Sequence, residues 1–410
     1  MVFVGGGVAR AAPLRSVQLT PKAPQQMNAS DLRIALISGN YHMVRDGPTQ
    51  ALNRLVGYLL SKGAKVRVFA PTVEHPQVEP TGELVPVPSF ALPGRKEYRF
   101  PLGLYGKAWR KFAEFEPNMI HVASPDFAAR QAAKWGRDHH VPVLASVHTR
   151  FETYPRYYGM GFTEGIVERW LKTYYRRADA LMAPAETMRQ VLLEQGMHDE
   201  IGIWSRGVDR TLFNPARRSL EWRRSLGIGD EEVAIGFIGR IVMEKGLDAF
   251  SDTIAELNRR GVPHRVLVIG DGPARAWFAG RLPGNAVFAG LLHPPEIGMA
   301  VASMDVLLNP SVTEAFGNVT LEAMACGVPV AAARATGADF LVKDGVTGAL
   351  VEPNSVQGFA DVLQAYVEQP KLRAKHGAAG ERRSLEFDWD RINQGMLETY
   401  LRLVRQRAGK

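Results

Sequence analysis

A single cysteine, Cys326, is present in the 410 residues of this chain. One cysteine excludes an intrachain disulfide framework and a metal site built from several thiolates, and it favours a reducing compartment. Cys326 lies in an apolar run, and no signature of a histidine or another base accompanies it. We therefore predict a buried structural thiol rather than a catalytic nucleophile.

Long hydrophobic runs are also missing, since no apolar segment approaches the roughly 18 residues that a membrane-spanning helix needs. Residues 1–30 carry three basic and no acidic side chains, and their apolar part is short and interrupted by glycine. This pattern is poor for a signal peptide. We predict that residues 1–30 form a flexible extension.

Negative charge is scarce in the first half of the chain. Residues 1–205 contain 25 Lys and Arg against 18 Asp and Glu, a net charge of +7, whereas residues 206–410 contain 25 against 24, a net charge of +1. The excess favours contact with something anionic, either lipid headgroups or nucleic acid. Nucleic acid is the weaker alternative, because no recognition helix or aromatic-basic RNA signature is present.

Short apolar runs of β type alternate with helical patterns along the chain, beginning with "RIALISG" at 33–39 and again with "VAIGFIG" at 233–239. This alternation is typical of parallel sheets that are covered on both faces. We predict an α/β protein with two doubly wound domains that face a cleft. The expected parts are a first domain at 31–208, a linker at 209–232, a second domain at 233–385 and a long amphipathic helix at 386–410.

Two cations, Arg240 and Lys245, follow the strand "GFIG" of the second domain. They would lie at the carboxyl end of the strand, where they suit a diphosphate that carries charge as it leaves. The alternative is two solvated surface charges. A nearby segment, "IGDGPA" at 269–274, lacks the third glycine of the dinucleotide fingerprint, so a plain strand-to-helix turn fits it as well as a phosphate loop does.

Two glutamates, Glu314 and Glu322, flank a Gly-Asn-Val turn in "TEAFGNVTLEAMACG". Gly317 allows a ligand to approach the backbone closely, and the free N–H groups around Asn318 and Val319 suit a phosphate. Carboxylates on either side would accept hydrogen bonds from the hydroxyls of a sugar and a ribose. Taken alone, Glu314 could simply complement the helix dipole. Together with the upstream cations, the pattern predicts a nucleotide-sugar site.

The stretch "EAFGNVTLE", followed by "AMACGVPV", resembles the E-x7-E signature of the family-four retaining glycosyltransferases with the GT-B fold. "GRIVMEKG", "GDGP", "GVDRTLFNP" and "DGVTGALVEP" are similar to other blocks of that family, in the expected order, so the resemblance covers residues 31–400. It implies two Rossmann-like domains, a C-terminal helix that crosses back to the first domain, and transfer of a sugar from a nucleotide donor.

The resemblance also implies roles for residues of the second domain. Arg240 and Lys245 bind the donor diphosphate and stabilise the leaving group. Glu314 contacts hydroxyls of the donor sugar, Glu322 contacts the ribose, and the backbone of 317–319 holds the phosphate and sugar. Family members need no bound metal, because the two cations replace it. No Asp-x-Asp metal motif is evident here, so we expect no metal and no cofactor.

In the first domain, His148 of "PVLASVHTRF" matches the position of the family's active-site histidine near the donor sugar, although a lone histidine is more often structural. "NYHMVRDG" occupies the place of the family's glycine-containing loop, which implies that Gly47, beside Asp46, approaches the donor phosphate. The family usually has more glycine in this loop than the present chain has.

The acceptor is expected to bind the first domain. Residues 90–115 interleave basic and aromatic side chains, which suits shallow contact with a membrane. An ordinary helix that packs its aromatic side on the sheet is the alternative. The residues predicted to contact the acceptor or the membrane are Arg95, Tyr98, Arg99 and Trp109.

"SVHTRFETYPRYYG" and "SRGVDRTLFNP" are similar to the lipid-modifying branch that contains sulfoquinovosyl- and glucosyl-diacylglycerol synthases and phosphatidylinositol mannosyltransferases. This resemblance implies a UDP-hexose or UDP-hexuronate donor, with GDP-mannose as the alternative. It also implies a diacylglycerol-like or sphingolipid acceptor. The net charge of +7 and the basic, aromatic residues 90–115 favour a lipid acceptor at an anionic membrane surface, and an enzyme peripheral on the inner face of the cytoplasmic membrane. A transferase for soluble or polysaccharide acceptors is the rival enzyme. A catalytically inactive sugar-binding scaffold would leave the paired glutamates and cations unexplained.

Overall fold

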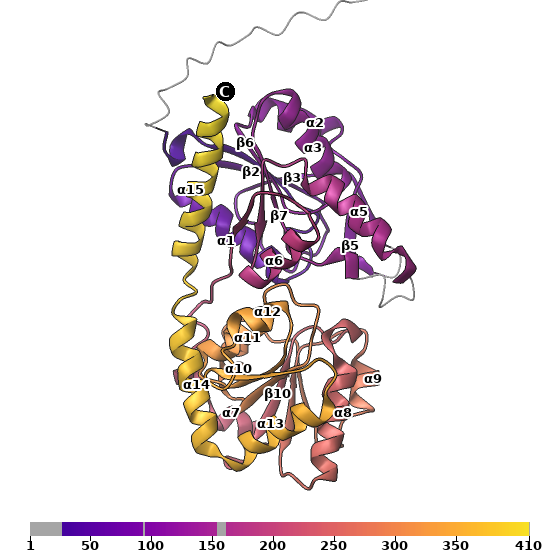
Figure 1. The fold of residues 1–410 in the computed structure, drawn as a ribbon, viewed down its shortest axis with the longest axis vertical. Helices are drawn as coiled ribbons and strands as arrows, with labels where there is room; N and C mark the ends of the chain where they lie inside the picture. The colour runs from indigo at the N-terminus through magenta and orange to yellow at the C-terminus, as the bar shows by residue number, and fades with distance from the viewer. Residues whose placement is uncertain (1–26, 93–94, 154–160, 410) are drawn as a thin grey trace, which may run out of the picture.

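The computed structural model describes residues 27–92, 95–153 and 161–409. Two α/β domains lie one above the other in Figure 1, with the N-terminal domain uppermost, and each is built on a parallel sheet. This confirms the predicted fold class of two doubly wound, Rossmann-like domains. Of the predicted flexible extension, residues 1–26 lie outside the described residues, whereas Ala29–Asp31 form the 3₁₀ helix η1.

Seven parallel strands form the N-terminal sheet in the described part of the chain, in the order β3-β2-β1-β6-β7-β8-β9. They are β1 (Arg33–Ile37), β2 (Lys65–Ala70), β3 (Glu83–Pro86), β6 (Met119–Val122), β7 (Val143–Ser146), β8 (Ala180–Ala183) and β9 (Ile201–Ile203). Successive side chains of a strand point to opposite faces. In β1, Ile34 and Leu36 therefore join one core cluster, and Ala35 and Ile37 join the other.

Helices cover both faces of this sheet, as the nearly continuous apolar strands require. Helix α1 (Gly47–Ser61) packs on the face of Ile34 and Leu36. The opposite face carries α2 (Gly106–Phe115), α3 (Phe127–Asp138), α5 (Glu164–Tyr175) and α6 (Glu186–Glu194), which bury small and aromatic side chains against it.

The C-terminal sheet repeats the pattern, in the order β12-β11-β10-β13-β14-β15. Its strands are β10 (Ala234–Ile238), β11 (Arg265–Ile269), β12 (Val287–Gly290), β13 (Val306–Asn309), β14 (Val330–Ala333) and β15 (Gly348–Val351). One face is covered by α8 (Leu247–Arg259), α9 (Arg275–Ala279) and α13 (Val356–Glu368). The other face carries α10 (Glu296–Ala302) and α11 (Asn318–Ala325), while α12 (Thr336–Leu341) packs against α6 of the N-terminal domain.

The last two helices connect the domains. Helix α14 (Pro370–Ser384) lies beside the C-terminal domain, and α15 (Trp389–Ala408) runs along the N-terminal domain, as the yellow end of the chain in Figure 1 shows. Met396 and Tyr400 of α15 are buried in the same core cluster as α1. The guanidinium of Arg405 donates a hydrogen bond to the carbonyl oxygen of Met27 at 2.7 Å. The C-terminal helix therefore crosses back, as the resemblance implies.

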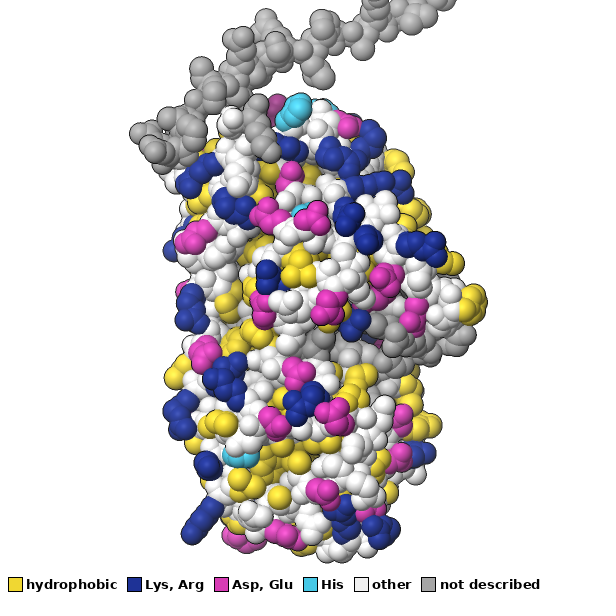
Figure 2. All heavy atoms as spheres, viewed as in Figure 1, with side chains coloured by type: hydrophobic (Ala, Val, Ile, Leu, Met, Phe, Trp, Pro, Cys, Tyr) yellow, Lys and Arg dark blue, Asp and Glu magenta, His cyan; other side chains and the backbone are white. Residues whose placement is uncertain are grey.

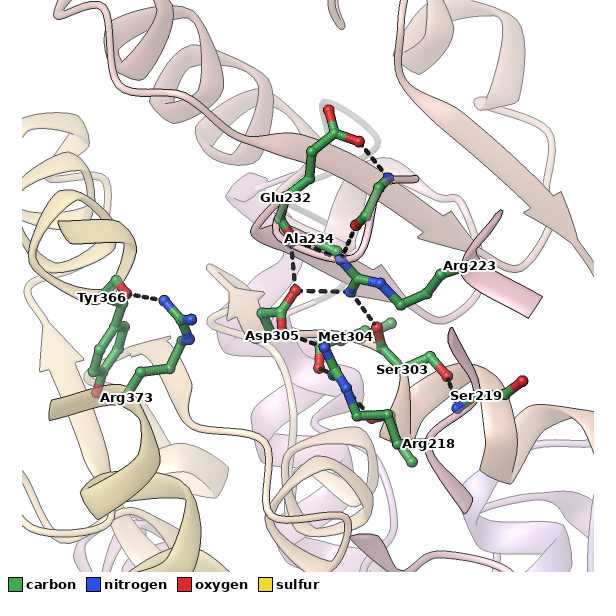
Figure 3. Close-up of polar contacts among 12 residues, drawn as sticks. Arg218, Ser219, Arg223, Glu232, Ala234, Ser303, Met304, Asp305, Tyr366 and Arg373 are labelled. Carbon is green, nitrogen blue, oxygen red and sulfur yellow. Dashed lines mark hydrogen bonds and ion pairs between the residues drawn. The ribbon is translucent and has the colours of Figure 1, made fainter. Parts of the chain in front are cut away.

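Residues 209–232, which the sequence predicts to be a linker, include η4 (Pro215–Arg217) and α7 (Leu220–Ser225) and are anchored to the C-terminal sheet. Arg223 is fully buried, and its guanidinium donates to Asp305 Oδ2 and to the Ser303 carbonyl, each at 2.8 Å (Figure 3). Arg218 pairs with the other oxygen of Asp305 at 2.7 Å. Asp305 stands at the start of β13, so these bonds attach the segment to a central strand.

Residues 90–115, predicted as one basic and aromatic segment, divide into two parts. An antiparallel hairpin of β4 (Ser89–Leu92) and β5 (Arg95–Pro101) precedes α2. Phe112 of α2 is fully buried between the rings of Phe69 and Trp135, which lie 5.5 and 5.1 Å away by their centroids. The aromatic side of α2 therefore packs on the sheet, which is the arrangement of the ordinary-helix alternative.

Each sheet reverses its strand order beside its first strand, between β1 and β6 and between β10 and β13. In doubly wound sheets, ligands bind at such switch points, beyond the carboxyl ends of the strands. The two switch points adjoin, because the loop after β1 meets α11 of the other domain. Within the described residues, no helix combines the length and the apolarity needed to cross a bilayer.

Candidate active site

Two loops of the C-terminal domain form one wall of the cleft. The loop after β10 contains Arg240 and the 3₁₀ helix η5 (Met243–Lys245), and the loop after β13 contains Glu314. They are tied together, because the Thr313 hydroxyl donates to the carbonyl of Glu244 at 2.9 Å. Residues that the sequence separates by about seventy positions are thus held side by side.

Lys245 and Glu314 form an ion pair across these loops. The Lys245 Nζ atom lies 2.8 Å from Glu314 Oε1, and the two side chains are 32% and 12% exposed. Pairing of an acid with a base in partial burial offsets part of the cost of taking each side chain out of water. The structure therefore places the predicted phosphate-binding cation directly beside the predicted sugar-binding carboxylate.

Helix α11 begins at the cleft with Gly317, whose φ of 93° and ψ of 54° are left-handed and suit glycine. Within the described residues no side chain caps this terminus, so the N–H groups of Asn318 and Val319 keep the anion-binding character of a helix start. A Cβ atom at 317 would stand 3.3 Å from Glu314 Oε2. The turn thus brings the backbone at Gly317 close to the carboxylate of Glu314.

Glu322 lies one turn inside α11 and is half-buried. Burial, and to a smaller extent the charge of Glu314, raise its pKa to about 8 against the opposing effect of Arg45. At neutral pH the group is therefore largely protonated, and a carboxylic acid can both donate to and accept from ribose hydroxyls. Arg45, in the loop after β1, has no place in the sequence prediction, although it stands in the quoted "NYHMVRDG".

Gly47 is the first residue of α1 and lies against the side chain of Asn318, so that a Cβ atom at 47 would collide with the Asn318 amide. The preceding Asp46 caps α1 by accepting from Thr49 N at 2.9 Å. The predicted approach of Gly47 to a donor phosphate stays a prediction, and its close neighbour in this structure is the start of α11.

A cavity of about 350 Å³ opens at this meeting point between the domains. Its lining combines α1 and the loop before it, the segment after β9, the Pro294–Pro295 turn, α11 and Trp389 of α15. Glu322 and Asn318 both line it. A cavity built from both domains with several polar groups has the character of a small-molecule site.

Arg240 reaches across the cleft to the β4–β5 hairpin. Its Nη1 atom lies 3.5 Å from the Tyr98 hydroxyl, and its guanidinium lies 5.7 Å from the centre of the Tyr98 ring, which is cation–π range. A residue predicted to bind the donor diphosphate thus meets one predicted to contact the acceptor. The sequence gives no sign of this contact between residues 142 positions apart.

His148 follows β7, and its imidazole is held on both sides. Arg206 Nη2 lies 2.9 Å from Nδ1, and Ser146 Oγ lies 2.9 Å from Nε2. An arginine only donates, so Nδ1 accepts and the ring proton sits on Nε2. Burial and the charge of Arg206 also hold the pKa of His148 well below its usual range. The ring is therefore neutral, and both of its nitrogens are used inside the protein.

The chain of hydrogen bonds continues from Ser146 into the core. Ser146 Oγ lies 2.7 Å from His121 Nε2, and His121 Nδ1 lies 2.7 Å from the hydroxyl of Tyr400. The crossover helix α15 is thereby connected to His148 through buried polar groups. The sequence prediction missed Arg206, Ser146, His121 and Tyr400. The available signal was a histidine inside the apolar strand "MIHV".

The N-terminal switch point carries a second missed group, Asp126. Its carboxylate caps α3 through Ala129 N at 2.9 Å and accepts from the Ser124 hydroxyl, which in turn accepts from Gly39 N at 2.7 Å. Burial raises the pKa of Asp126 to about 6. These bonds join the loops after β1 and β6, so Asp126 shapes this end of the cleft.

The remaining candidates, Arg99, Trp109 and Arg95, belong to the β4–β5 hairpin and α2. Arg99 donates to the hydroxyl and carbonyl of Ser89, both at 2.9 Å, within the hairpin. Trp109 is half-buried and stacks on Phe112. Arg95 lies in β5, but its side chain is outside the described residues. Contact of these residues with an acceptor or a membrane stays a prediction.

Two other sequence features are now placed. Cys326 is buried, as predicted, and burial raises the pKa of its thiol. In "IGDGPA", the loop packs so closely that Cβ atoms at Gly270 and Gly272 would collide with the backbone of Gly239 and Ile241. This is the close packing of a strand-to-helix turn. Among the described residues, no group of three or more His, Cys, Asp and Glu could hold a metal ion.

Comparison with known families agrees with this architecture. Residues 45–212 match the model of Glycosyltransferase Family 4, and residues 232–369 match that of Glycosyl transferases group 1. Together the matches span most of both domains. The chain belongs to the family-four glycosyltransferases with the GT-B fold.

Individual relatives have names that indicate different transferase activities. The chain is 30% identical to the sulfoquinovosyl transferase SQD2 of Arabidopsis thaliana, over 84% of this chain and 68% of that protein. It is 27% identical to a GDP-mannose-dependent alpha-mannosyltransferase of Corynebacterium glutamicum, over 91% and 89%. It is 24% identical to the alpha-monoglucosyldiacylglycerol synthase of Streptococcus pneumoniae, over 83% and 80%. Among solved structures, the sucrose-phosphate synthase of Thermosynechococcus elongatus has a similar fold, with a TM-score of 0.72, 19% identity, and coverage of 90% of this chain and 98% of that one.

Proposed function

We propose that this glycosyltransferase moves a hexose or hexuronate from a nucleotide donor to a membrane lipid, with retention of the anomeric configuration and formation of an α-glycosidic bond. The observation that carries the proposal is the convergence of three features at one switch point. These are the Lys245–Glu314 pair, the uncapped start of α11, and Glu322 inside the interdomain cavity.

The arrangement suggests one orientation of the donor. The diphosphate lies at the start of α11, where the helix N–H groups and Lys245 neutralise it and Arg240 approaches from the other side. Hydroxyls of the donor sugar hydrogen-bond to Glu314. The ribose lies against Glu322, and the base occupies the cavity toward Pro294 and Pro295. In this orientation the reacting carbon faces the N-terminal domain, where the acceptor binds.

The reaction then needs little covalent chemistry from the protein. The acceptor hydroxyl attacks from the face that the diphosphate leaves, and the departing phosphate oxygen accepts its proton. Lys245 and Arg240 stabilise the negative charge that develops on the leaving group, without a metal ion or another cofactor. His148 is neutral with both ring nitrogens bonded, so it shapes the sugar site rather than transferring a proton. The catalytic contribution is positioning and electrostatic stabilisation.

We infer the donor and the acceptor from the names of the relatives and from the net charge of residues 1–205. Relatives whose names indicate a sulfoquinovosyl or a diacylglycerol product support a UDP-sugar and a lipid acceptor, whereas the mannosyltransferase relatives favour GDP-mannose as the alternative donor. The net charge of +7 on residues 1–205 supports work at an anionic surface, which we place at the inner face of the cytoplasmic membrane.

A transfer assay with membrane lipids and a panel of UDP- and GDP-sugars tests the proposal. We compare wild type with Glu314→Ala and with Glu368→Ala, a control at an exposed position of α13 in the same domain. A glycolipid product that is lost only in Glu314→Ala supports the proposal and identifies the donor. Transfer only to water or soluble sugars contradicts the lipid acceptor. No consumption of any nucleotide sugar contradicts the site itself.

A further inference from the structure

An open groove of about 740 Å³ lies on the N-terminal domain and is distinct from the interdomain cavity. Its lining residues are Leu102, Tyr105, Phe127, Arg130, Gln131, Lys134, Arg137 and Arg177. Four of these side chains are cations, three are apolar or aromatic, and none is acidic. This combination suits a ligand that presents negative charge and hydrocarbon together.

The cations of the groove are poorly neutralised by the protein. Lys134 pairs with Asp138 at 2.6 Å on the exposed side of α3. Within the described residues, no carboxylate pairs with Arg130, Arg137 or Arg177 at ion-pair distance. The pKa of Arg177 is lowered by burial and by the charges of Arg130 and Arg137, so these two guanidiniums repel that of Arg177. Asp138, which pairs with Lys134, is also influenced by the charge of Arg137. An anion would relieve that repulsion.

The cations and one aromatic side chain follow a single face of α3. Phe127, Arg130, Lys134 and Arg137 are spaced by three or four residues, so they lie above one another on the helix surface. Phe127 also meets the ring of Phe100 at 5.5 Å, and Phe100 meets the exposed Phe90 at 5.7 Å. Apolar surface therefore continues from α3 onto the β4–β5 hairpin.

The neighbouring helix α5 adds exposed apolar side chains. Phe162, just before the helix, is 84% exposed, and Ile166 and Trp170, at successive intervals of four residues, are 64% and 41% exposed. Figure 1 draws α3 and α5 next to each other, and Figure 2 shows Lys and Arg gathered over the upper right of the same domain. Both signs of charge are mixed over the C-terminal domain in that view.

We propose that this surface, the α3/α5 face, docks on an anionic membrane. It is defined by the groove residues together with Phe162, Ile166 and Trp170. Cations attract the headgroups, and the exposed apolar side chains enter the boundary between headgroups and acyl chains. This proposal rests on the proposed lipid acceptor, and it locates membrane contact mainly on α3 and α5, whereas the sequence pattern pointed to residues 90–115.

The position of the face suits delivery of a lipid to the cleft. The N-cap of helix α3 is Asp126, whose side chain is bonded to Ser124 at the N-terminal switch point. One end of the α3/α5 face is thus next to the cleft, and the groove extends along the outer side of the same helix. A lipid in the docked membrane would have a short path from the groove to the acceptor side of the cleft.

Vesicle sedimentation tests the face directly. We compare wild type with Arg130→Glu/Arg137→Glu/Arg177→Glu and with a control that carries the same charge change, Lys343→Glu/Lys371→Glu/Lys375→Glu, at exposed positions of the C-terminal domain. Each cation near an anionic surface strengthens partitioning about fivefold. We expect at least about 100-fold weaker binding of the α3/α5 variant to vesicles of phosphatidylglycerol and phosphatidylcholine, and a much smaller loss for the control. Equal losses overturn the proposal.

A second variant, Phe162→Ser/Ile166→Ser, tests the apolar contribution without changing charge. It should weaken vesicle binding while thermal unfolding stays as in wild type, because both side chains are exposed. Unchanged binding overturns membrane docking through this face. Tighter binding of the wild type to RNA or heparin than to vesicles, lost in the arginine variant, assigns the surface to a different polyanion and also overturns it.

Activity separates this proposal from the proposed function. On a short-chain acceptor dissolved as monomers, the arginine variant should transfer sugar at the wild-type rate, whereas on vesicles it should be strongly impaired. If no lipid is glycosylated but vesicle binding still depends on the three arginines, the proposed function fails and the docking face stands. If glycolipid forms equally well on vesicles with and without these arginines, the docking face fails and the function stands.

Discussion

The two sheets have equivalent strand orders around their first strands, yet the polar groups at their switch points are used differently. In the N-terminal domain, Asp126, Ser124 and His148 are bonded to other groups of the protein. In the C-terminal domain, Lys245, Glu314 and the start of α11 converge on the cleft, and α11 lacks a side-chain cap within the described residues.

This difference distinguishes polar groups that shape the cleft from polar groups that can bind a ligand. A polar group that is already satisfied gains little from a ligand, whereas helix N–H groups and charges at the mouth of a cleft gain directly from a diphosphate. Under the proposed function, the C-terminal switch point is therefore the part that binds the donor. The N-terminal switch point is a wall held by internal hydrogen bonds, which under the same proposal bounds the space for the sugar and the acceptor.

The largest effect on activity is expected from Lys245→Met, which removes a positive charge from the C-terminal switch point. The leaving diphosphate loses a stabilising cation, and Glu314 loses its partner at 2.8 Å. We expect kcat to fall by roughly 100- to 1,000-fold, the range seen when one transition-state donor is removed. Steady-state kinetics with the identified donor measures it, and Lys343→Met, at an exposed position, is the control. A fall of less than tenfold contradicts the role of Lys245.

A smaller loss of activity is expected from Gly47→Ala, at a position where the two domains are in contact. The added methyl group collides with the Asn318 amide and forces the start of α11 or α1 to shift. Overpacking of about 1.4 kcal/mol corresponds to about a tenfold loss in kcat/KM for the donor. Gly57→Ala in the same helix is the control, because its methyl group would meet Thr81 at an ordinary 3.6 Å. Equal kinetics of the two variants would show that the contact does not matter.

A pH-dependent effect is expected from Glu322→Gln. The folded protein holds this carboxyl at a pKa of about 8, above its value in the unfolded chain, so folding is penalised increasingly as pH rises from about 4.5 to 8. The variant removes that penalty. Its unfolding temperature should match wild type near pH 5 and exceed it near pH 8.5, in thermal scans across this range. A constant difference at all pH values contradicts the raised pKa.

The smallest effect on activity is expected from Tyr400→Phe, which breaks the series of buried hydrogen bonds that leads to His148. Tyr366→Phe is a matched control, because Tyr366 bonds to His376 at 2.8 Å in the C-terminal domain, away from the cleft. Each change should cost about 1–2 kcal/mol of stability, since a buried histidine nitrogen loses its partner. Only Tyr400→Phe should also lower kcat, by a few-fold. Identical kinetics for both variants would mean that this series of hydrogen bonds has only a structural role.

Much of the architecture could be predicted from the sequence. Alternation of short apolar strands with helical patterns gives two parallel sheets, because each strand buried on both faces must be apolar throughout. The spacing of Glu314 and Glu322 around Gly317, and the cations after β10, point to the C-terminal site because these signals are local. The contact between Arg240 and Tyr98 and the bond between Arg206 and His148 could not be predicted, since they join residues that only the domain arrangement brings together.

The sequence by itself determined the two sheets, the crossover helix and the group of residues that is proposed to face the donor. Tertiary structure decided which of the polar and aromatic side chains remain available to contact a ligand or another surface. The aromatic side of α2 is turned into the core, and the ring of His148 is bonded on both nitrogens. Arg130 and Arg137 of α3 and Arg177 are brought together, and none of the described carboxylates lies at ion-pair distance from them. The physical reason is that local periodicity sets which face of an element is apolar, whereas charge and hydrogen bonding depend on neighbours from distant parts of the chain.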